Sequence, residues 1–133
     1  MTDYKTTLIA DEGLRLKPYK CTAGKWTIGV GRNLDAKGIS EAEAMFMLGN
    51  DIKDAKAAAR RLIRTFDVLS DDRKIALVSM VFQMGETGVS KFRNMIKCIE
   101  MQSFDIAAAE MLQSRWAVQT PERAKRLSDM MKG

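Results

Sequence analysis

The chain has 133 residues, of which 46% are hydrophobic and 29% are charged, as expected for one soluble globular domain. No apolar run approaches the roughly 18 residues that a membrane-spanning helix requires, so a transmembrane protein is excluded. With no histidine and two cysteines, the sequence also excludes the usual zinc sites and a disulfide scaffold. We therefore expect neither a metal nor a cofactor.

The formal net charge is +5, which favours an anionic partner without choosing among nucleic acid, anionic lipid and bacterial cell wall. The first residues, MTDYKTTLIADEGL, lack the basic-then-apolar order of a secretory signal. We expect the protein to stay soluble in the cytosol unless another factor releases it.

The first predicted elements are a helix and a small sheet. Residues 4–12 read as a short helix that Gly13 ends. Residues 15–35 alternate turn-forming residues with the β-formers Tyr19, Trp26, Thr27, Ile28 and Val30. This pattern predicts two or three antiparallel strands.

A long helix follows over residues 41–65. Ser40 and Glu43 have the spacing of a capping box at its start. Apolar residues at 45, 48, 52, 55, 59, 62 and 66 lie on one helical face. At about 1.5 Å per residue the helix reaches roughly 37 Å, and this length favours a connector between two lobes.

In the second half of the sequence, helix-start signals at Ser70, Ser90, Ser103 and Thr120-Pro121 predict short helices that begin after these residues. The expected fold is therefore α+β and mostly helical, within a single domain, 1–133. It has a sheet lobe (13–39), a connecting helix (41–65) and a helical bundle (66–133) that includes the N-terminal helix. A cleft between such lobes is a common ligand site.

Without histidine, any general acid or base must be Asp, Glu, Cys, Tyr or Lys. Glu12 is the best-placed acid because it ends a helix just before the sheet, although its spacing alone favours a solvated helix-end charge paired with Arg15. Desolvation among apolar groups is what keeps such a carboxyl protonated for acid catalysis.

The two cysteines have different surroundings. Cys21 alone reads as a small buried residue, but it lies in a polar turn between Lys20 and Lys25, whose positive charge would lower the pKa of a thiol. Cys98 lies on a predicted helix beside the apolar stripe of Phe92, Met95, Ile96 and Ile99, so we expect it to belong to the core.

The stretch DEGLRLKPYKCTAGKWTIGVGRNL resembles the catalytic segment of the phage endolysins of the T-even lysozyme type (glycoside hydrolase family twenty-four). That family has Glu, then eight residues, Asp or Cys, then five residues and Thr. Glu12, Cys21 and Thr27 stand at this spacing. VFQMGETGV (81–89) and SRWAVQTPERAKR (114–126) also match, so the resemblance covers nearly the whole chain in order.

The resemblance implies a lysozyme-like fold and a muramidase that cleaves the β-1,4 bond between N-acetylmuramic acid and N-acetylglucosamine of peptidoglycan. In that reading Glu12 is the general acid, Cys21 takes the second position, where many members have Asp, and Thr27 holds the attacking water. The implied cleft-lining residues are Gly31, Asn33, Phe82, Gln83 and Arg115. We expect Cys21 to help position or activate the nucleophile while Glu12 does the indispensable chemistry.

The sequence departs from the family pattern in two places. The linker between the sheet and the long helix is short, and larger relatives carry an additional helix there. Arg32 stands where histidine is frequent, and we predict that it pairs with Asp51 near the start of the long helix.

Two other functions remain open at this point: a lytic transglycosylase that uses the same acid, and a peptidoglycan binder without catalysis. A basic nucleic-acid binder is supported by net charge alone, and we expect no nucleic-acid partner. The resemblance further implies a monomeric endolysin without stable membrane association. It would wait in the host cytoplasm, reach the wall through pores made by a holin and lyse the host.

Overall fold

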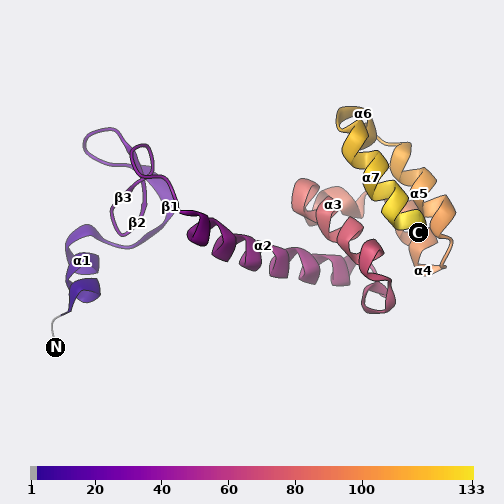
Figure 1. Cartoon of the computed structure of the whole chain (residues 1–133), viewed down its shortest axis with the longest axis horizontal. Coiled ribbons are helices and arrows are strands. Elements are labelled where there is room, and N and C mark those ends of the chain that lie inside the picture. The colour runs from indigo at the N-terminus through magenta and orange to yellow at the C-terminus, as the bar shows by residue number, and fades with distance from the viewer. Residues whose placement is uncertain (1–2) are drawn as a thin grey trace. The chain divides into compact units, whose positions relative to one another are not determined.

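The structure, a computed structural model, describes residues 3–133. The chain divides into two compact units, Met1–Phe46 and Met47–Gly133, and the boundary falls inside helix α2. In chain order the elements are α1 Tyr4–Glu12, β1 Arg15–Lys20, β2 Trp26–Gly29, β3 Arg32–Asn33, α2 Glu41–Leu62, η1 Phe66–Val68, α3 Asp71–Ser90, α4 Arg93–Glu100, α5 Phe104–Leu112, α6 Arg115–Gln119 and α7 Pro121–Lys132 (Figure 1).

The first unit consists of α1, the sheet and the first turns of α2. Asp3 caps α1 by accepting a hydrogen bond of 2.7 Å from the Thr6 amide. Gly13 ends the helix as predicted, with φ of 79° and its amide bonded to the Ile9 carbonyl at 2.8 Å. The sheet is antiparallel, as the sequence predicted, and its three strands lie in the order β1-β2-β3.

Helix α2 begins at the predicted capping box. The Ser40 amide donates to Glu43 Oε1 at 2.8 Å, and the Glu43 amide donates to Ser40 Oγ at 3.1 Å. The helix ends at Leu62 rather than at residue 65. The chain turns there, and Phe66, which had extended the apolar pattern, is buried from the 3-10 turn η1 instead.

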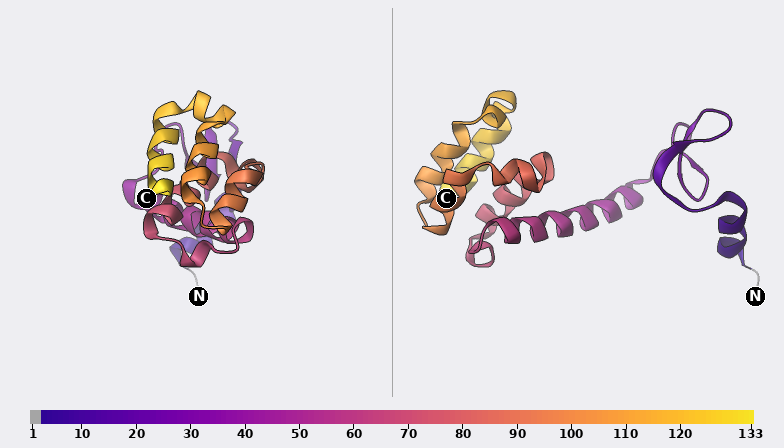
Figure 2. Two further views of the ribbon diagram at one scale, coloured as in Figure 1. Left: turned by 90° about the vertical axis from the view of Figure 1, so that its right-hand side faces the viewer. Right: turned by 180° about the vertical axis from the view of Figure 1, so that it is seen from behind.

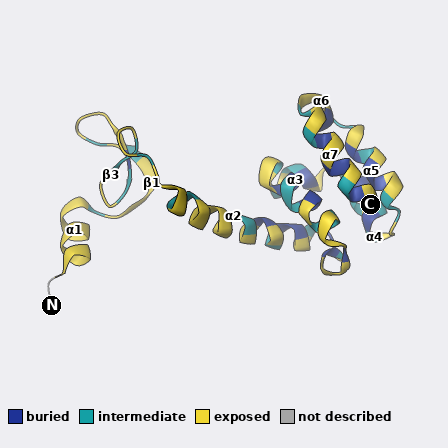
Figure 3. Ribbon diagram, in the orientation of Figure 1, coloured by how far each residue is buried: buried dark blue, intermediate teal, exposed yellow. Residues whose placement is uncertain are grey.

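The second unit holds the hydrophobic core. Its largest fully buried side chains include Phe66, Ile63, Leu77, Ile99 and four methionines, and these four methionines fill the core. Figures 1 and 2 show α5 and α7 side by side, and these two helices pack closely. Buried residues are concentrated in this unit, whereas the first turns of α2 are exposed (Figure 3).

Most predicted helix starts in the second unit are confirmed. Ser70 caps α3 by accepting from the Arg73 amide at 3.3 Å, and Ser103 and Thr120 immediately precede α5 and α7. The prediction for Ser90 is wrong. It is the last residue of α3, its hydroxyl donates to the Thr87 carbonyl, and the next helix begins only after Phe92.

The predicted α+β class, with a small antiparallel sheet and a mostly helical remainder, is confirmed. Cys98 contacts the core together with Phe92 and Ile96, as predicted. Within residues 3–133, no helix is both long and apolar enough to cross a membrane. The assignment of the N-terminal helix to the helical lobe of one domain stays a prediction.

Candidate functional site

Cys21 begins the tight loop between β1 and β2. Its amide donates to the Lys25 carbonyl at 2.9 Å, and its own carbonyl accepts from the Gly24 amide at 2.8 Å. Gly24 has φ of 76°, a conformation that glycine adopts without strain. The loop therefore fixes Cys21 through its backbone and leaves the side chain half-buried.

The loop amides change the acidity of the Cys21 thiol. Hydrogen bonding from the Lys25 amide, followed by that from the Ala23 amide, lowers the pKa of this thiol. The sequence predicted a lowered pKa but attributed it to the charges of Lys20 and Lys25. The main cause is the backbone of the loop.

Thr27 lies at the centre of the sheet, where its Cα pairs with those of Tyr19 and Asn33. The residue is 4% exposed, which is unusual for a hydroxyl side chain. Its Oγ1 donates to the Lys25 carbonyl at 2.9 Å, so the hydroxyl is oriented and its lone pairs remain able to accept. The structure thus brings Thr27 and Cys21 together at one hairpin loop.

Glu12 is the last residue of α1, and its side chain lies along the backbone of Gly31. A Cβ atom built on Gly31 would lie 2.8 Å from Glu12 Oε2 and 3.2 Å from both its Cβ and its Cδ. Gly31 also has φ of 64°. The backbone conformation favours glycine at position 31, and a Cβ atom there would also require the exposed Glu12 side chain to move.

Asn33 and Asp35 stabilise the chain that leaves the sheet. Asn33 Oδ1 accepts from the Ala36 amide at 3.0 Å, so this side chain forms a turn and keeps only its amide hydrogens free. Asp35 Oδ2 accepts from the Trp26 amide at 2.9 Å, next to Thr27. Asp35 was not predicted from the sequence, although it belongs to the turn-forming stretch DAKG.

The predicted pairing of Arg32 with Asp51 is wrong. The Arg32 guanidinium bonds both oxygens of Glu43, at 3.1 and 2.6 Å, and also the Gly38 carbonyl at 3.1 Å. Asp51 lies eight residues further along α2, about 12 Å at the helical rise per residue. Arg32 pairs with Glu43 because the capping box holds the Glu43 carboxylate at the start of the helix, next to the guanidinium.

The second unit contains a pocket of about 660 Å³ lined by Gln83, Phe92, Glu110, Arg115 and Trp116, among others. The Trp116 indole donates to Gln83 Oε1 at 2.8 Å, which leaves the Gln83 amide hydrogens free to donate. Phe92 packs edge-on against Trp116, with ring centroids 6.2 Å apart. Trp116 and Glu110 were not singled out from the sequence.

The predicted site residues fall into two groups. Glu12, Cys21, Thr27, Gly31 and Asn33 lie in the first unit, whereas Phe82, Gln83 and Arg115 lie in the second. Gln83 and Arg115 share the 660 Å³ pocket, but Phe82 does not line it and contributes to two other, more apolar surfaces. Among residues 3–133, no group of three or more His, Cys, Asp or Glu side chains could hold a metal ion.

Comparison with known proteins identifies the family. The model of the phage lysozyme family matches residues 10–130. "Probable T4-type lysozyme 2" and "Probable T4-type lysozyme 1" of Dictyostelium discoideum are 33% and 32% identical to this chain, and each alignment covers 96% of the chain and 92% of the relative. "Endolysin" of Acyrthosiphon pisum secondary endosymbiont phage 1 is 32% identical over 80% of this chain and 71% of its own length.

The alignment with the first Dictyostelium protein extends over 157 positions, more than the 133 residues of this chain, so the relative carries residues without a counterpart here. The family match nevertheless reaches from the end of α1 to the end of α7. The chain therefore belongs to the phage lysozyme family and is a glycoside hydrolase.

Proposed function

We propose that this glycoside hydrolase is a muramidase that cleaves the β-1,4 bond between N-acetylmuramic acid and N-acetylglucosamine in bacterial peptidoglycan, with Glu12 as its general acid. The observation that carries the proposal is the contact between the Glu12 carboxyl and Gly31 in the unit that also holds Cys21 and Thr27. The contact places the Glu12 carboxyl beside the Gly31 backbone, where it stays exposed and can deliver a proton to a bound sugar.

In this mechanism Glu12 donates its proton to the glycosidic oxygen as the bond to the leaving sugar breaks. A water molecule then forms a bond to the anomeric carbon, where positive charge has developed, and gives up one proton to the Cys21 thiolate or to solvent. Cys21 and Thr27 position that water. The Thr27 hydroxyl can accept from the water because its own proton is engaged by the Lys25 carbonyl.

Cys21 replaces the second carboxylate of glycosidases. An ordinary thiol with a pKa near 8.5 is mostly neutral at pH 7, and a neutral thiol is a poor base. The lowered pKa of Cys21 increases the thiolate fraction, so the sulfur can polarise the water and place a negative charge near the developing cation. Cys21 thereby supports the reaction, and Glu12 remains indispensable.

Substrate contacts are proposed for Gly31 and Asn33 in the first unit and for Phe82, Gln83 and Arg115 in the second. The free amide hydrogens of Gln83 and the exposed guanidinium of Arg115 can donate to the carbonyl and carboxylate groups of a peptidoglycan strand. The 48% exposed ring of Phe82 offers an apolar contact.

The experiment that tests this proposal digests purified peptidoglycan and analyses the new chain ends by mass spectrometry. A muramidase leaves N-acetylmuramic acid with a free reducing end. An anhydro-sugar end would instead show a lytic transglycosylase, and binding to the wall without new ends would show a non-catalytic homologue. Either of these results contradicts the proposal, and Glu12→Gln serves as the inactive control.

The proposed cellular role is endolysis by a monomer that depends on a holin to reach the wall. The endolysin among the relatives supports it. Expression of the chain in a bacterial host should cause lysis only when a pore-forming protein is expressed with it. Lysis by the chain alone would contradict the dependence on a holin.

A further inference from the structure

We propose that Arg32 and Glu43 are positioning residues for Glu12, and that their ion pair holds the β2–β3 turn against the Glu12 carboxyl. This inference rests on the proposed role of Glu12 as the general acid. Neither residue needs to contact the substrate, since the effect is transmitted through Gly31, the neighbour of Arg32 in the chain.

Few backbone contacts fix the β2–β3 turn. Strand β3 has two residues, and its ladder with β2 has the pairs Thr27 with Asn33 and Ile28 with Arg32. Gly29 and Gly31, on either side of Val30, have φ of 70° and 64°. Glycines with these angles cost more conformational entropy to order than other residues, so a two-residue strand needs further contacts to fix the turn.

Arg32 supplies these contacts. Its guanidinium forms a two-pronged ion pair with Glu43, with a shortest distance of 2.6 Å, and donates a third bond to the Gly38 carbonyl at 3.1 Å. The two side chains are 28% and 42% exposed, so the pair is less solvated than the other ion pairs of the described residues. Two parallel bonds fix orientation as well as distance.

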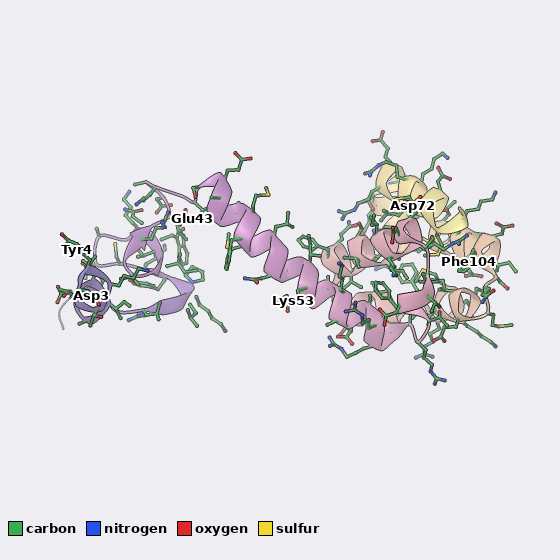
Figure 4. All side chains as sticks on the ribbon, turned by 60° about the horizontal axis from the view of Figure 1, so that its bottom comes forward. Asp3, Tyr4, Glu43, Lys53, Asp72 and Phe104 are labelled. Carbon is green, nitrogen blue, oxygen red and sulfur yellow. The ribbon has the colours of Figure 1, made fainter. Side chains whose placement is uncertain are left out.

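Glu43 is itself held by the start of α2, where it is visible in Figure 4. Its Oε1 accepts from the Ser40 amide at 2.8 Å while its own amide bonds Ser40 Oγ at 3.1 Å. The Arg32–Glu43 pair thus connects a glycine-rich turn to the rigid end of a helix.

The Glu12 carboxyl contacts this turn, because a Cβ atom on Gly31 would lie 2.8 Å from Glu12 Oε2. A displacement of the turn therefore changes the contact that limits where the carboxyl lies. Misplacement of a catalytic group by about 1 Å can cost on the order of 100-fold in rate. We expect the pair to affect kcat rather than KM.

The test measures kcat and KM on solubilised peptidoglycan for Arg32→Ala, Arg32→Lys and Glu43→Gln. Glutamine still accepts from the Ser40 amide, so Glu43→Gln removes the charge and keeps the helix cap. Ser40→Ala is the matched control, because it weakens the cap and leaves both partners of the ion pair in place. Each variant is assayed at a temperature at which circular dichroism shows it fully folded.

We expect Arg32→Ala to lower kcat about 10- to 100-fold with KM within about twofold of wild type. The kcat values of Arg32→Lys and Glu43→Gln should lie between those of Arg32→Ala and the wild type. Added guanidinium ion should restore part of the kcat of Arg32→Ala. Ser40→Ala should lower the melting temperature and keep kcat. A loss of folded protein alone would respond neither to guanidinium nor to the choice of lysine.

Glu12→Gln separates the two proposals. If this variant keeps wild-type kcat, Glu12 is not the acid, and both the proposed function and the positioning role fail. If Glu12→Gln is inactive while Arg32→Ala keeps wild-type kcat, the positioning role alone is overturned. The same follows if Ser40→Ala loses as much kcat as Arg32→Ala.

Discussion

At position 31 two requirements for glycine can be separated by experiment. The backbone has a positive φ, and the Glu12 carboxyl lies where a side chain would begin. Gly29 shares the first requirement, with φ of 70°, but a Cβ atom built there meets nothing within 4 Å. The two glycines therefore form a matched pair.

Gly31→Ala and Gly29→Ala should each cost roughly 1 to 2 kcal/mol of stability, because both force a side chain into the left-handed region. Only Gly31→Ala should also lower kcat on peptidoglycan, since the methyl group pushes the Glu12 carboxyl aside. Urea denaturation and steady-state kinetics check the two effects. Equal activity losses in the two variants would show that strain, not the contact with Glu12, governs activity.

Cys21 has a pKa lowered mainly by the Lys25 and Ala23 amides of its loop. We predict that iodoacetamide alkylates Cys21 at neutral pH faster than an unstructured thiol and faster than Cys98, which contacts the core. The rate measured against pH in Cys98→Ser should have a midpoint below the ordinary value of about 8.5.

Lys25→Ala keeps the amide of residue 25 and removes the charge, so it distinguishes the two possible causes of the lowered pKa. The alkylation midpoint should stay close to that of the parent protein. A midpoint that rises to the ordinary thiol value in Lys25→Ala would instead assign the effect to the lysine charge.

At the scale of elements, the start of α2 depends on an ionised carboxylate. Hydrogen bonding from the Ser40 amide, helped by the charge of Arg32, lowers the pKa of Glu43. Because the folded pKa lies below the unfolded one, the stabilisation by Glu43 is complete above about pH 4.3 and is lost as the pH falls through the folded pKa.

The free energy of unfolding should therefore fall less steeply with acid in Glu43→Gln than in the wild type. Urea denaturation midpoints of both proteins check this prediction. They are measured from neutral pH down to about pH 3, a range that spans the ordinary pKa of Glu. Parallel curves for the two proteins would mean that Glu43 does not contribute to the acid sensitivity.

The end of α7 depends on a single arginine of α3. Arg73 Nε donates to the Met131 carbonyl at 2.7 Å, another guanidinium nitrogen donates to the Lys132 carbonyl at 2.9 Å, and the group lies 3.6 Å from the ring centroid of Phe104. The last carbonyls of a helix have no partner within the helix, so Arg73 caps α7 and fastens it to α3 and α5.

Arg73→Lys should destabilise the protein by roughly 1 to 2 kcal/mol, because lysine can neither bond both carbonyls in one plane nor stack as well on Phe104. Thermal unfolding measures the loss. Lys125→Ala is the control, since its ion pair with Asp129 is exposed on both sides and should contribute little. Equal effects of the two substitutions would contradict the capping role.

At the scale of the whole molecule, the features predicted from sequence are those that depend on near neighbours in the chain. The Ser40–Glu43 capping box, the Gly13 helix end and the three short strands each follow from a few adjacent residues. Cys21, Thr27 and Gly31 were expected together in the sheet lobe, because they lie close to one another in the chain, whereas Glu12 was expected with the helical lobe.

Two predictions were wrong, one about which acid pairs with Arg32 and one about whether a helix ends before Ser90. The sequence of α2 offers Arg32 several acids, and the choice of Glu43 depends on a carboxylate that the Ser40 amide already holds. Ser90 resembles a helix cap, but α3 continues to it through a break at Gly85, with φ of 80°. The contact of Glu12 with Gly31 joins a helix end to a turn, and no local pattern reveals it.

In the proposed mechanism Glu12 performs the chemistry and Cys21 assists it. The most direct test compares kcat on purified peptidoglycan for Glu12→Gln, Cys21→Asp and Cys21→Ser. We predict that Glu12→Gln loses at least about 100-fold, the scale of general acid catalysis, and that Cys21→Asp keeps most of the activity. An active Glu12→Gln, or an inactive Cys21→Asp beside a fully active Cys21→Ser, would contradict the account.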